Sequence, residues 1–131
     1  MPANGTSTVN CPALAVAPTP PTVTDACGNN ITPTPGAAPT APACEGDMVY
    51  SFTYADCAGN SHVWTYTYTI DIPDFTLPTN GASTVTCPAL AVPPTPPVVN
   101  DACGTPITPV PGAAPSTLTC EGDMVYTFTY T

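Results

Sequence analysis

The sequence contains no lysine and no arginine among its 131 residues, whereas aspartate and glutamate together number nine. Its formal net charge at pH 7 is therefore -9. Nucleic acids and anionic membrane surfaces are bound through cationic side chains, which this chain lacks. We therefore expect neither nucleic acid nor direct membrane insertion for this protein. Its stability must come from burial and covalent links, because strong salt bridges are excluded.

Amphipathic helical patterns are also absent, and no signal peptide is visible after Met1. Twenty prolines and many threonines would suit a disordered stalk, but hydrophobic residues make up 43% of the chain. In residues 49–54 and 64–70 the aromatics occupy every second position, which predicts two half-buried strands with one threonine-rich face each. The turn residues between them predict a hairpin with Tyr54 opposite Trp64, Phe52 opposite Tyr66 and Tyr50 opposite Tyr68.

The chain repeats itself. Residues 1–55 align with residues 77–131 at a constant offset of 76 without a gap, and 39 of the 55 aligned positions are identical. The stretch CPALAVAPTPPTVTDACG returns almost unchanged, and CEGDMVYSFTY returns as CEGDMVYTFTY. Near-identical neighbouring units are typical of arrays that perform one mechanical role many times, whereas an enzyme needs its chemistry once. We therefore expect no enzymatic activity.

The repeat defines the domain organisation. Residues 1–76 form a complete unit, residues 71–78 a short proline-containing linker, and residues 77–131 a second unit that stops before the counterpart of the last strand. We interpret the chain as a window from a longer array. Shorter strands are expected at residues 6–11 and 22–26, and the prolines confine pairing to edges and loops. The sequence thus predicts an all-β fold: tandem small immunoglobulin-like antiparallel β-sandwiches, stapled by disulfides.

The seven cysteines suggest disulfides. The first unit has Cys11, Cys27, Cys44 and Cys57, and the second has Cys87, Cys103 and Cys120. Pairing of Cys44 with Cys57 is unfavourable because the strand between them would separate them by roughly 30 Å. In an immunoglobulin-like sandwich, the expected pairs are Cys11–Cys44, Cys27–Cys57 and Cys87–Cys120, with Cys103 paired to a cysteine beyond the window; Cys11–Cys27 is the alternative. No close CxxC pair points to zinc, and disulfides imply an oxidising, extracellular compartment.

The stretch Val49–Ile70, with TYADCAGN before alternating aromatics, resembles the end of HYR repeats, which are immunoglobulin-like modules. The start TVNCPAL resembles their Cys-Pro beginning, and the combination of DACGN, CEG and YADCAGN resembles tandem repeats of large secreted adhesin-type proteins of Bacteroidota. The resemblance implies an adhesive or scaffolding role at the cell surface and no catalytic residues. A cysteine that such repeats commonly have near Trp64 is missing, and Cys44 is present instead.

Several residues suggest sharper hypotheses. His62 with a nearby aspartate could be part of a catalytic triad, but no nucleophile elbow accompanies it. Asp71 and Asp74 are the candidates for calcium, which needs six to eight oxygen ligands; no other cofactor is expected. Trp64, Tyr66 and Tyr68 could stack on sugars, but they share parity with Tyr50 and Phe52, which favours a place in the core. Asp25, Asp56 and Asp101 flank loop cysteines and are expected to cap turns.

Glycosylation has several candidate positions. Asn4 and Asn30 match the N-linked acceptor motif, although the second copy has lost both sites. O-linked sugar is expected on exposed threonines, with the candidates Thr19, Thr22, Thr32 and Thr34.

Two functions remain. The first is a structural module of an extracellular stalk, fibril or filament that supports adhesion, whose partners are neighbouring repeats or copies of itself. The second is a module that binds surface glycans by avidity. A subunit that assembles like a pilin, by donating a strand to an open neighbour, is a variant of the first.

Overall fold

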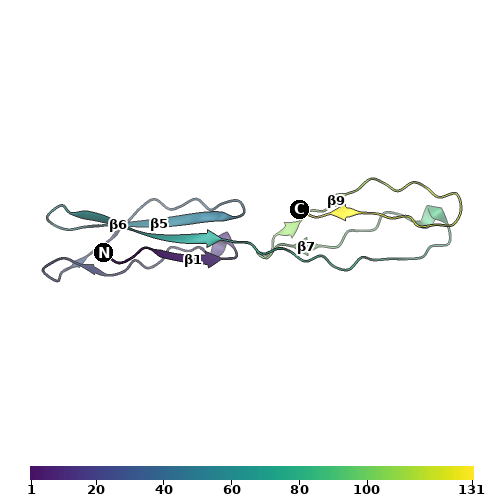
Figure 1. Ribbon diagram of the computed structural model, residues 1–131. Coiled ribbons are helices and arrows are strands. Elements are labelled where there is room, and N and C mark those ends of the chain that lie inside the picture. Colours follow the sequence, from purple (N-terminus) through teal and green to yellow (C-terminus); the bar gives the residue numbers. More distant parts are fainter. The chain divides into compact units, whose positions relative to one another are not determined.

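The computed structural model describes all residues, Met1–Thr131, as two compact units, unit 1 (Met1–Pro73) and unit 2 (Asp74–Thr131). Both units are built from β-strands and irregular loops (Figure 1). The only helical elements are two single 3₁₀ turns, η1 (Pro12–Leu14) and η2 (Pro88–Leu90). The all-β fold expected from the alternating sequence pattern is therefore confirmed.

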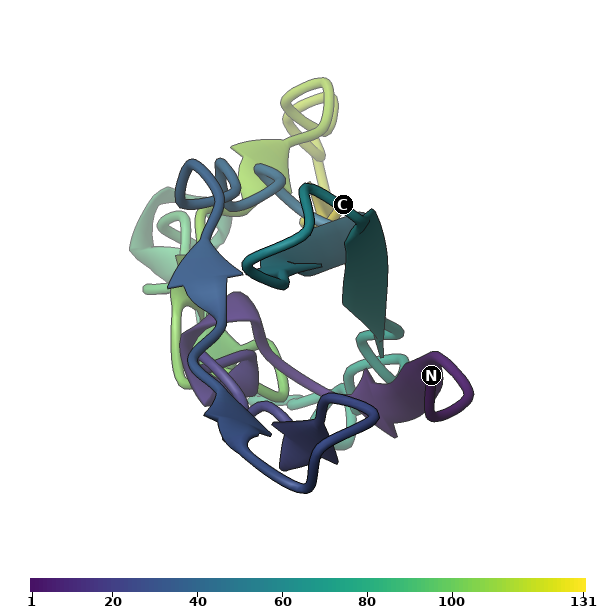
Figure 2. The ribbon, with the colours of Figure 1, turned by 90° about the vertical axis from the view of Figure 1, so that its left-hand side faces the viewer.

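Unit 1 contains a four-stranded sheet with the order β1-β6-β5-β4 and a separate pair of short strands, β2 and β3. The strands are β1 (Gly5–Val9), β2 (Val23–Thr24), β3 (Asn30–Ile31), β4 (Thr34–Pro35), β5 (Gly46–Ala55) and β6 (Ser61–Ile70). Neighbouring strands are antiparallel except β1 and β6, which run parallel. In the end-on view of Figure 2, β2 and β3 lie across the interior of unit 1 from β6 and β5.

The hairpin of β5 and β6 forms as expected, but its register differs from the expected one by two residues. Phe52 pairs with Trp64, Tyr50 with Tyr66 and Met48 with Tyr68. The reason is the turn. Asp56 donates its backbone N–H to the carbonyl of Asn60, so five residues form the loop and strand pairing begins at Ala55 and Ser61. A shift of two residues keeps every side chain on its original face.

The core of unit 1 has two clusters of buried side chains along the same sheet. One consists of Ala15, Met48 and Ile70. The other consists of Phe52, Tyr54 and Trp64, which are 8%, 2% and 6% exposed. Tyr50 packs against both clusters and therefore joins them. Aromatic rings also meet along the sheet, at centroid distances of 5.8 Å for Phe52–Trp64 and 4.9 Å for Tyr66–Tyr68. The predicted aromatic ladder is thus part of the core.

Unit 2 has shorter strands than unit 1. Strands β7 (Val99–Asn100) and β8 (Pro106–Ile107) pair with each other, as do β9 (Val110–Pro111) and β10 (Phe128–Thr129). Residues 81–85, the counterparts of β1, form no strand. In unit 1, β6 is the only partner of β1 and the longest partner of β5. The extended conformation of both strands in unit 1 therefore depends on β6.

The parallel contact between β1 and β6 requires a glycine. A Cβ atom on Gly5 would lie 2.3 Å from Cδ2 of Tyr66, closer than side chains approach one another. The ring of Tyr66 has little freedom to move away, because it packs between Trp64 and Tyr68 at centroid distances of 5.9 and 4.9 Å. The counterpart of Gly5 in unit 2 is Gly81, where a Cβ would meet nothing within 4 Å.

We expect Gly5→Ala to destabilise unit 1 by about 1–3 kcal/mol, because the added methyl group overpacks the sheet. The measurement is denaturant unfolding of the whole chain, followed by the fluorescence of Trp64, the only tryptophan, which lies in unit 1. Gly81→Ala is the matched control and should leave this transition unchanged. Equal stability of the two variants would contradict the proposed contact.

Candidate functional site

Tyrosine hydroxyl groups attach the proline-rich loop of unit 1 to its sheet. Tyr50 Oη donates to the carbonyl of Ala15 at 2.7 Å, and Tyr54 Oη donates to the carbonyl of Pro21 at 2.5 Å. Proline has no N–H group, so a loop rich in proline cannot form a regular ladder with a neighbouring strand. The two hydroxyl groups hold the loop without one. Burial also raises the pKa of Tyr54 above its ordinary value.

The same attachment occurs in unit 2. Tyr126 donates to the carbonyl of Ala91 and Tyr130 to the carbonyl of Pro97, both at 2.7 Å. These tyrosines are the counterparts of Tyr50 and Tyr54 at the offset of 76. The alternation of aromatics predicts tyrosine rings in the core, but the role of the hydroxyl groups was not predicted. The signal was available, since both tyrosines and the proline-rich segment recur together in the second copy.

Tight turns at one end of unit 1 share a single hydrogen-bond pattern. Asp25 Oδ1 accepts from the backbone N–H groups of Cys27 and Asn29 at 2.8 and 2.9 Å, and Asp25 Oδ2 accepts from Asn29 Nδ2 at 3.0 Å. In each turn of unit 1 a glycine with a positive φ lies three residues after the aspartate; φ is 84° for Gly28 and 86° for Gly59.

The other two turns repeat this pattern. Asp56 accepts from the N–H groups of Ala58 and Asn60 at 2.9 Å and from Asn60 Nδ2 at 2.8 Å. Asp101 in unit 2 accepts from the N–H groups of Cys103 and Thr105. The expectation that these three aspartates cap turns is confirmed.

The turns perturb the two aspartates of unit 1 electrostatically. The side-chain hydrogen bond from Asn29 holds the pKa of Asp25 below its ordinary value, aided by the backbone N–H groups of the turn. The Asn60 side chain does the same to the pKa of Asp56. The Asp56 charge has a small opposing effect on the pKa of Asp25, so the two turns lie near each other. We call this end of unit 1, with the turns 25–29 and 56–60, the turn pole.

A shallow pocket of about 280 Å³ opens at the turn pole. Its lining includes Asp25, Asp56, Asn60, Tyr54 and His62. His62 is exposed and lies opposite Tyr54 in the hairpin. Both carboxylates already accept hydrogen bonds from their own turns. A catalytic triad would need a serine beside His62, and no serine is among the residues that line this pocket.

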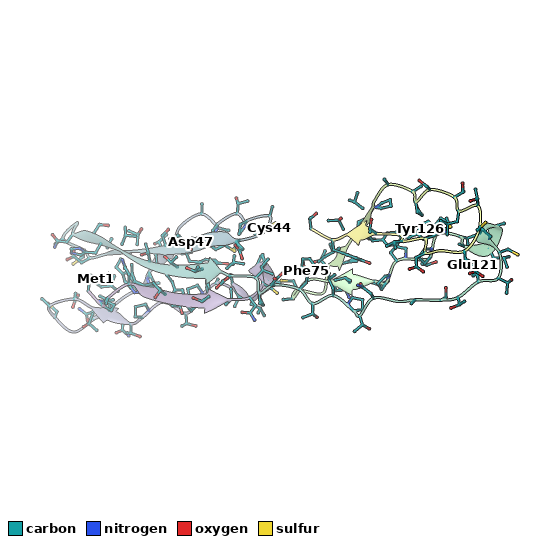
Figure 3. The ribbon with its side chains drawn as sticks, turned by 45° about the vertical axis from the view of Figure 1, so that its right-hand side comes forward. Met1, Cys44, Asp47, Phe75, Glu121 and Tyr126 are labelled. Atoms are coloured by element: carbon teal, nitrogen blue, oxygen red, sulfur yellow. The ribbon has the colours of Figure 1, made fainter.

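The opposite end of unit 1 is where β1 and β6 finish, and we call it the strand-end pole. Val9 and Gly46 both pair with Ile70, so Cys11 and Cys44 lie just beyond this row of residues. Figure 3 labels Cys44 in the loop that precedes β5. Cys27 and Cys57 lie in the turns of the turn pole. The structure thus places the four cysteines at the two ends of the unit, two at each end.

The three expected disulfides are not formed in the structure. Cys27, Cys44, Cys57, Cys87 and Cys120 are free and exposed thiols. Cys11 and Cys103 are disulfide-bonded. Cys27 and Cys57 share the turn pole but occupy different positions in their turns, two residues and one residue after the capping aspartate. The pairings Cys11–Cys44, Cys27–Cys57 and Cys87–Cys120, and a partner for Cys103 beyond the window, stay predictions for the oxidised protein.

The glycosylation candidates all have exposed side chains, namely Asn4, Asn30, Thr19, Thr22, Thr32 and Thr34. They differ in what else the side chain does. Asn4 Oδ1 accepts from the backbone N–H of Thr65 at 3.1 Å, so its amide already fixes the start of the chain to β6. Trp64 Nε1 donates to the carbonyl of Ala3 at 2.7 Å and fixes the same segment. Asn30 makes no such contact and is the more accessible N-linked candidate.

The structure contains no group of three or more His, Cys, Asp or Glu residues that could hold a metal ion. Of the two calcium candidates, Asp74 Oδ1 accepts from the backbone N–H of Phe75, and Asp71 donates its own N–H to the carbonyl of Val9.

The structure has no helix with the length and hydrophobicity needed to span a membrane. The three aromatic residues considered for sugar stacking are part of the core or pack against it: Trp64 is buried, and Tyr66 and Tyr68 pack against the two clusters. Their rings are therefore engaged in packing within unit 1.

Comparison with known families assigns the chain to one of them. The family described as "HYR-like domain with 4 cysteines" matches residues 1–70 and again residues 75–131. The protein therefore belongs to the HYR-like family, with two copies of the domain. No curated protein and no solved structure matches the chain. HYR-like domains are repeat modules of extracellular proteins, and the family description agrees with four cysteines per complete unit.

We expect Tyr54→Phe to destabilise unit 1 by about 1–2 kcal/mol, because the carbonyl of Pro21 then loses its donor. The measurement is again denaturant unfolding followed by the fluorescence of Trp64. Tyr130→Phe removes the counterpart hydroxyl in unit 2 and should not move this transition. If Tyr54→Phe unfolds at the same denaturant concentration as the wild type, the hydroxyl does not hold the loop.

The hydrogen bonds of the turn aspartates predict that unit 1 loses stability in acid. A carboxylate whose pKa is lowered by folding stabilises the folded state above its ordinary pKa, and this contribution is lost as the pH falls through the lowered value. Unit 1 should therefore lose stability below about pH 4. In Asp25→Asn/Asp56→Asn the stability at pH 7 should be lower and the decline in acid shallower. Asp71→Asn, which removes an exposed carboxylate outside the turns, should keep the wild-type decline when thermal unfolding is measured from pH 7 to pH 2.

Proposed function

We propose that this protein is a structural repeat module of an extracellular stalk, fibril or filament that supports adhesion at the cell surface. The observation that carries the proposal is the repetition of the same mechanical contacts in both units. In both units two tyrosines attach the equivalent loop to the equivalent segment through the same carbonyl positions; they are Tyr50 and Tyr54 in unit 1, and Tyr126 and Tyr130 in unit 2. What the repeat preserves is how a unit is held together.

The surface of the units supports this role. Exposed threonines alternate with half-buried residues along β1 and along the proline-rich segment, and no cationic side chain is present. A uniformly acidic chain of this kind repels its neighbours electrostatically and stays soluble at high copy number. Exposed threonines also offer positions for O-linked sugar. Both properties suit a fibre that projects from a cell.

Glycan binding is the weaker candidate. Sugar-binding modules usually present exposed aromatic rings, whereas Phe52, Tyr54 and Trp64 of unit 1 are buried. Assembly like a pilin has one feature in its favour. Strand β10 pairs with β9 only, whereas its counterpart segment in unit 1 lies between two strands, so the second edge of β10 is open to an added strand.

The test is the mass and shape of the native polypeptide. We expect its denatured mass, measured before and after reduction and deglycosylation, to be many times 13.3 kDa. Electron microscopy of the undenatured material should show thin fibres with a regular repeat. A native chain of about 13 kDa that forms fibres only by assembly would favour strand addition instead. Compact particles with no fibres, together with specific retention on a glycan array, would overturn the structural role.

A further inference from the structure

The cysteines of unit 1 are confined to its two poles. Cys27 and Cys57 are in the capped turns of the turn pole, and Cys11 and Cys44 lie beyond the row of Val9, Gly46 and Ile70. None is in a strand. A disulfide that staples a sandwich usually joins its two sheets through the core, whereas cysteines at the poles face whatever the ends of the unit meet.

The direction of the chain gives the poles different roles. The chain enters unit 1 at the turn pole, since Met1 lines the pocket there with Asp25 and Asp56. It leaves at the strand-end pole, since β6 finishes at Ile70, next to the last residue of β1. Along a chain of such units, each strand-end pole is therefore followed by the turn pole of the next unit, and two cysteine positions by two cysteine positions.

Free and exposed thiols are found at both kinds of pole. The two cysteines that share the turn pole, Cys27 and Cys57, are both free and exposed. So are Cys87 and Cys120, which are the counterparts of the two strand-end positions.

We propose that four of the cysteines at the poles are cross-linking sites between copies of this chain, and that Cys87 and Cys120 of one chain form disulfides with Cys27 and Cys57 of a second copy. The proposal deepens the structural role and rests on it, because only an oxidising compartment would maintain the links. Each link forms one S–S bond from two thiols and releases two protons and two electrons. A disulfide oxidant such as oxidised glutathione accepts them and becomes two thiols.

Such links would give a fibre of small units a covalent backbone besides the peptide chain. A unit of this size buries a limited core and gains much from cross-links. Links between unlike poles also have a fixed polarity, so that they join copies head to tail. A surface made only of acidic and neutral side chains offers no salt bridge for this purpose.

The experiment is oxidation of the whole purified chain with glutathione disulfide at several protein concentrations. We expect a ladder of covalent multimers on a non-reducing gel that grows with concentration and collapses on reduction. Digestion with pepsin, which needs no Lys or Arg and works in acid where thiol exchange stops, should yield peptides that join residue 87 or 120 to residue 27 or 57. Cys27→Ser/Cys57→Ser and Cys87→Ser/Cys120→Ser should each abolish the ladder.

Cys44→Ser is the matched control, because it removes an exposed free thiol outside the proposed pairs and should leave the ladder intact. The fluorescence of Trp64 verifies that each variant is folded. Equimolar mixing of the two double variants should restore covalent dimers, since each supplies the thiols that the other lacks. Monomers that contain Cys27–Cys57 and Cys87–Cys120 peptides would overturn the proposal and establish staples within a pole. Fibres of the native polypeptide would still be seen in that case, so the proposed function would survive.

Discussion

The structure of each unit depends on how a proline-rich segment, which lacks backbone N–H donors, is attached to the β-sheet. The segment between η1 and β2 is rich in proline and cannot donate a ladder of backbone hydrogen bonds, yet it must cover one side of the core. Side chains from β5 supply the missing donors. Tyr50 and Tyr54 each combine a ring in the core with a hydroxyl group that reaches a loop carbonyl. Because one residue type provides both burial and attachment, a unit of about 73 residues can hold a long irregular loop in place.

Strand β6 holds the four-stranded sheet of unit 1 together. It pairs with β1 on one side and β5 on the other, and it contributes Trp64 and Ile70 to the two core clusters. In unit 2, the residues equivalent to β1 and to most of β5 have nearly the same sequence as in unit 1 but are not assigned to strands. Strand formation here is therefore a property of the pairing partner more than of local propensity.

The fold class, the hairpin and the capped turns could be predicted from the sequence, because each depends on a local pattern. The alternation of aromatics around Phe52 and the sequence DCAGN at Asp56 are examples. The predicted register of the hairpin differs from the observed one by two residues. The register depends on the number of residues in the turn, which the hydrogen bonds of Asp56 determine. The hydrogen bonds of the tyrosine hydroxyls connect residues more than 30 positions apart. The oxidation states of the cysteines depend on chemistry outside the unit. No local sequence pattern encodes either.

The parallel pairing of β1 with β6 has a consequence for a protein under tension. The chain enters through β1 and leaves through β6, and the five residue pairs from Gly5–Tyr66 to Val9–Ile70 lie between those two points. A force applied between the two ends of unit 1 would pull the strands past each other, so all the hydrogen bonds between β1 and β6 would be loaded together in shear. They would not open one at a time as in an unzipped hairpin. The topology of unit 1 is thus that of a mechanical clamp.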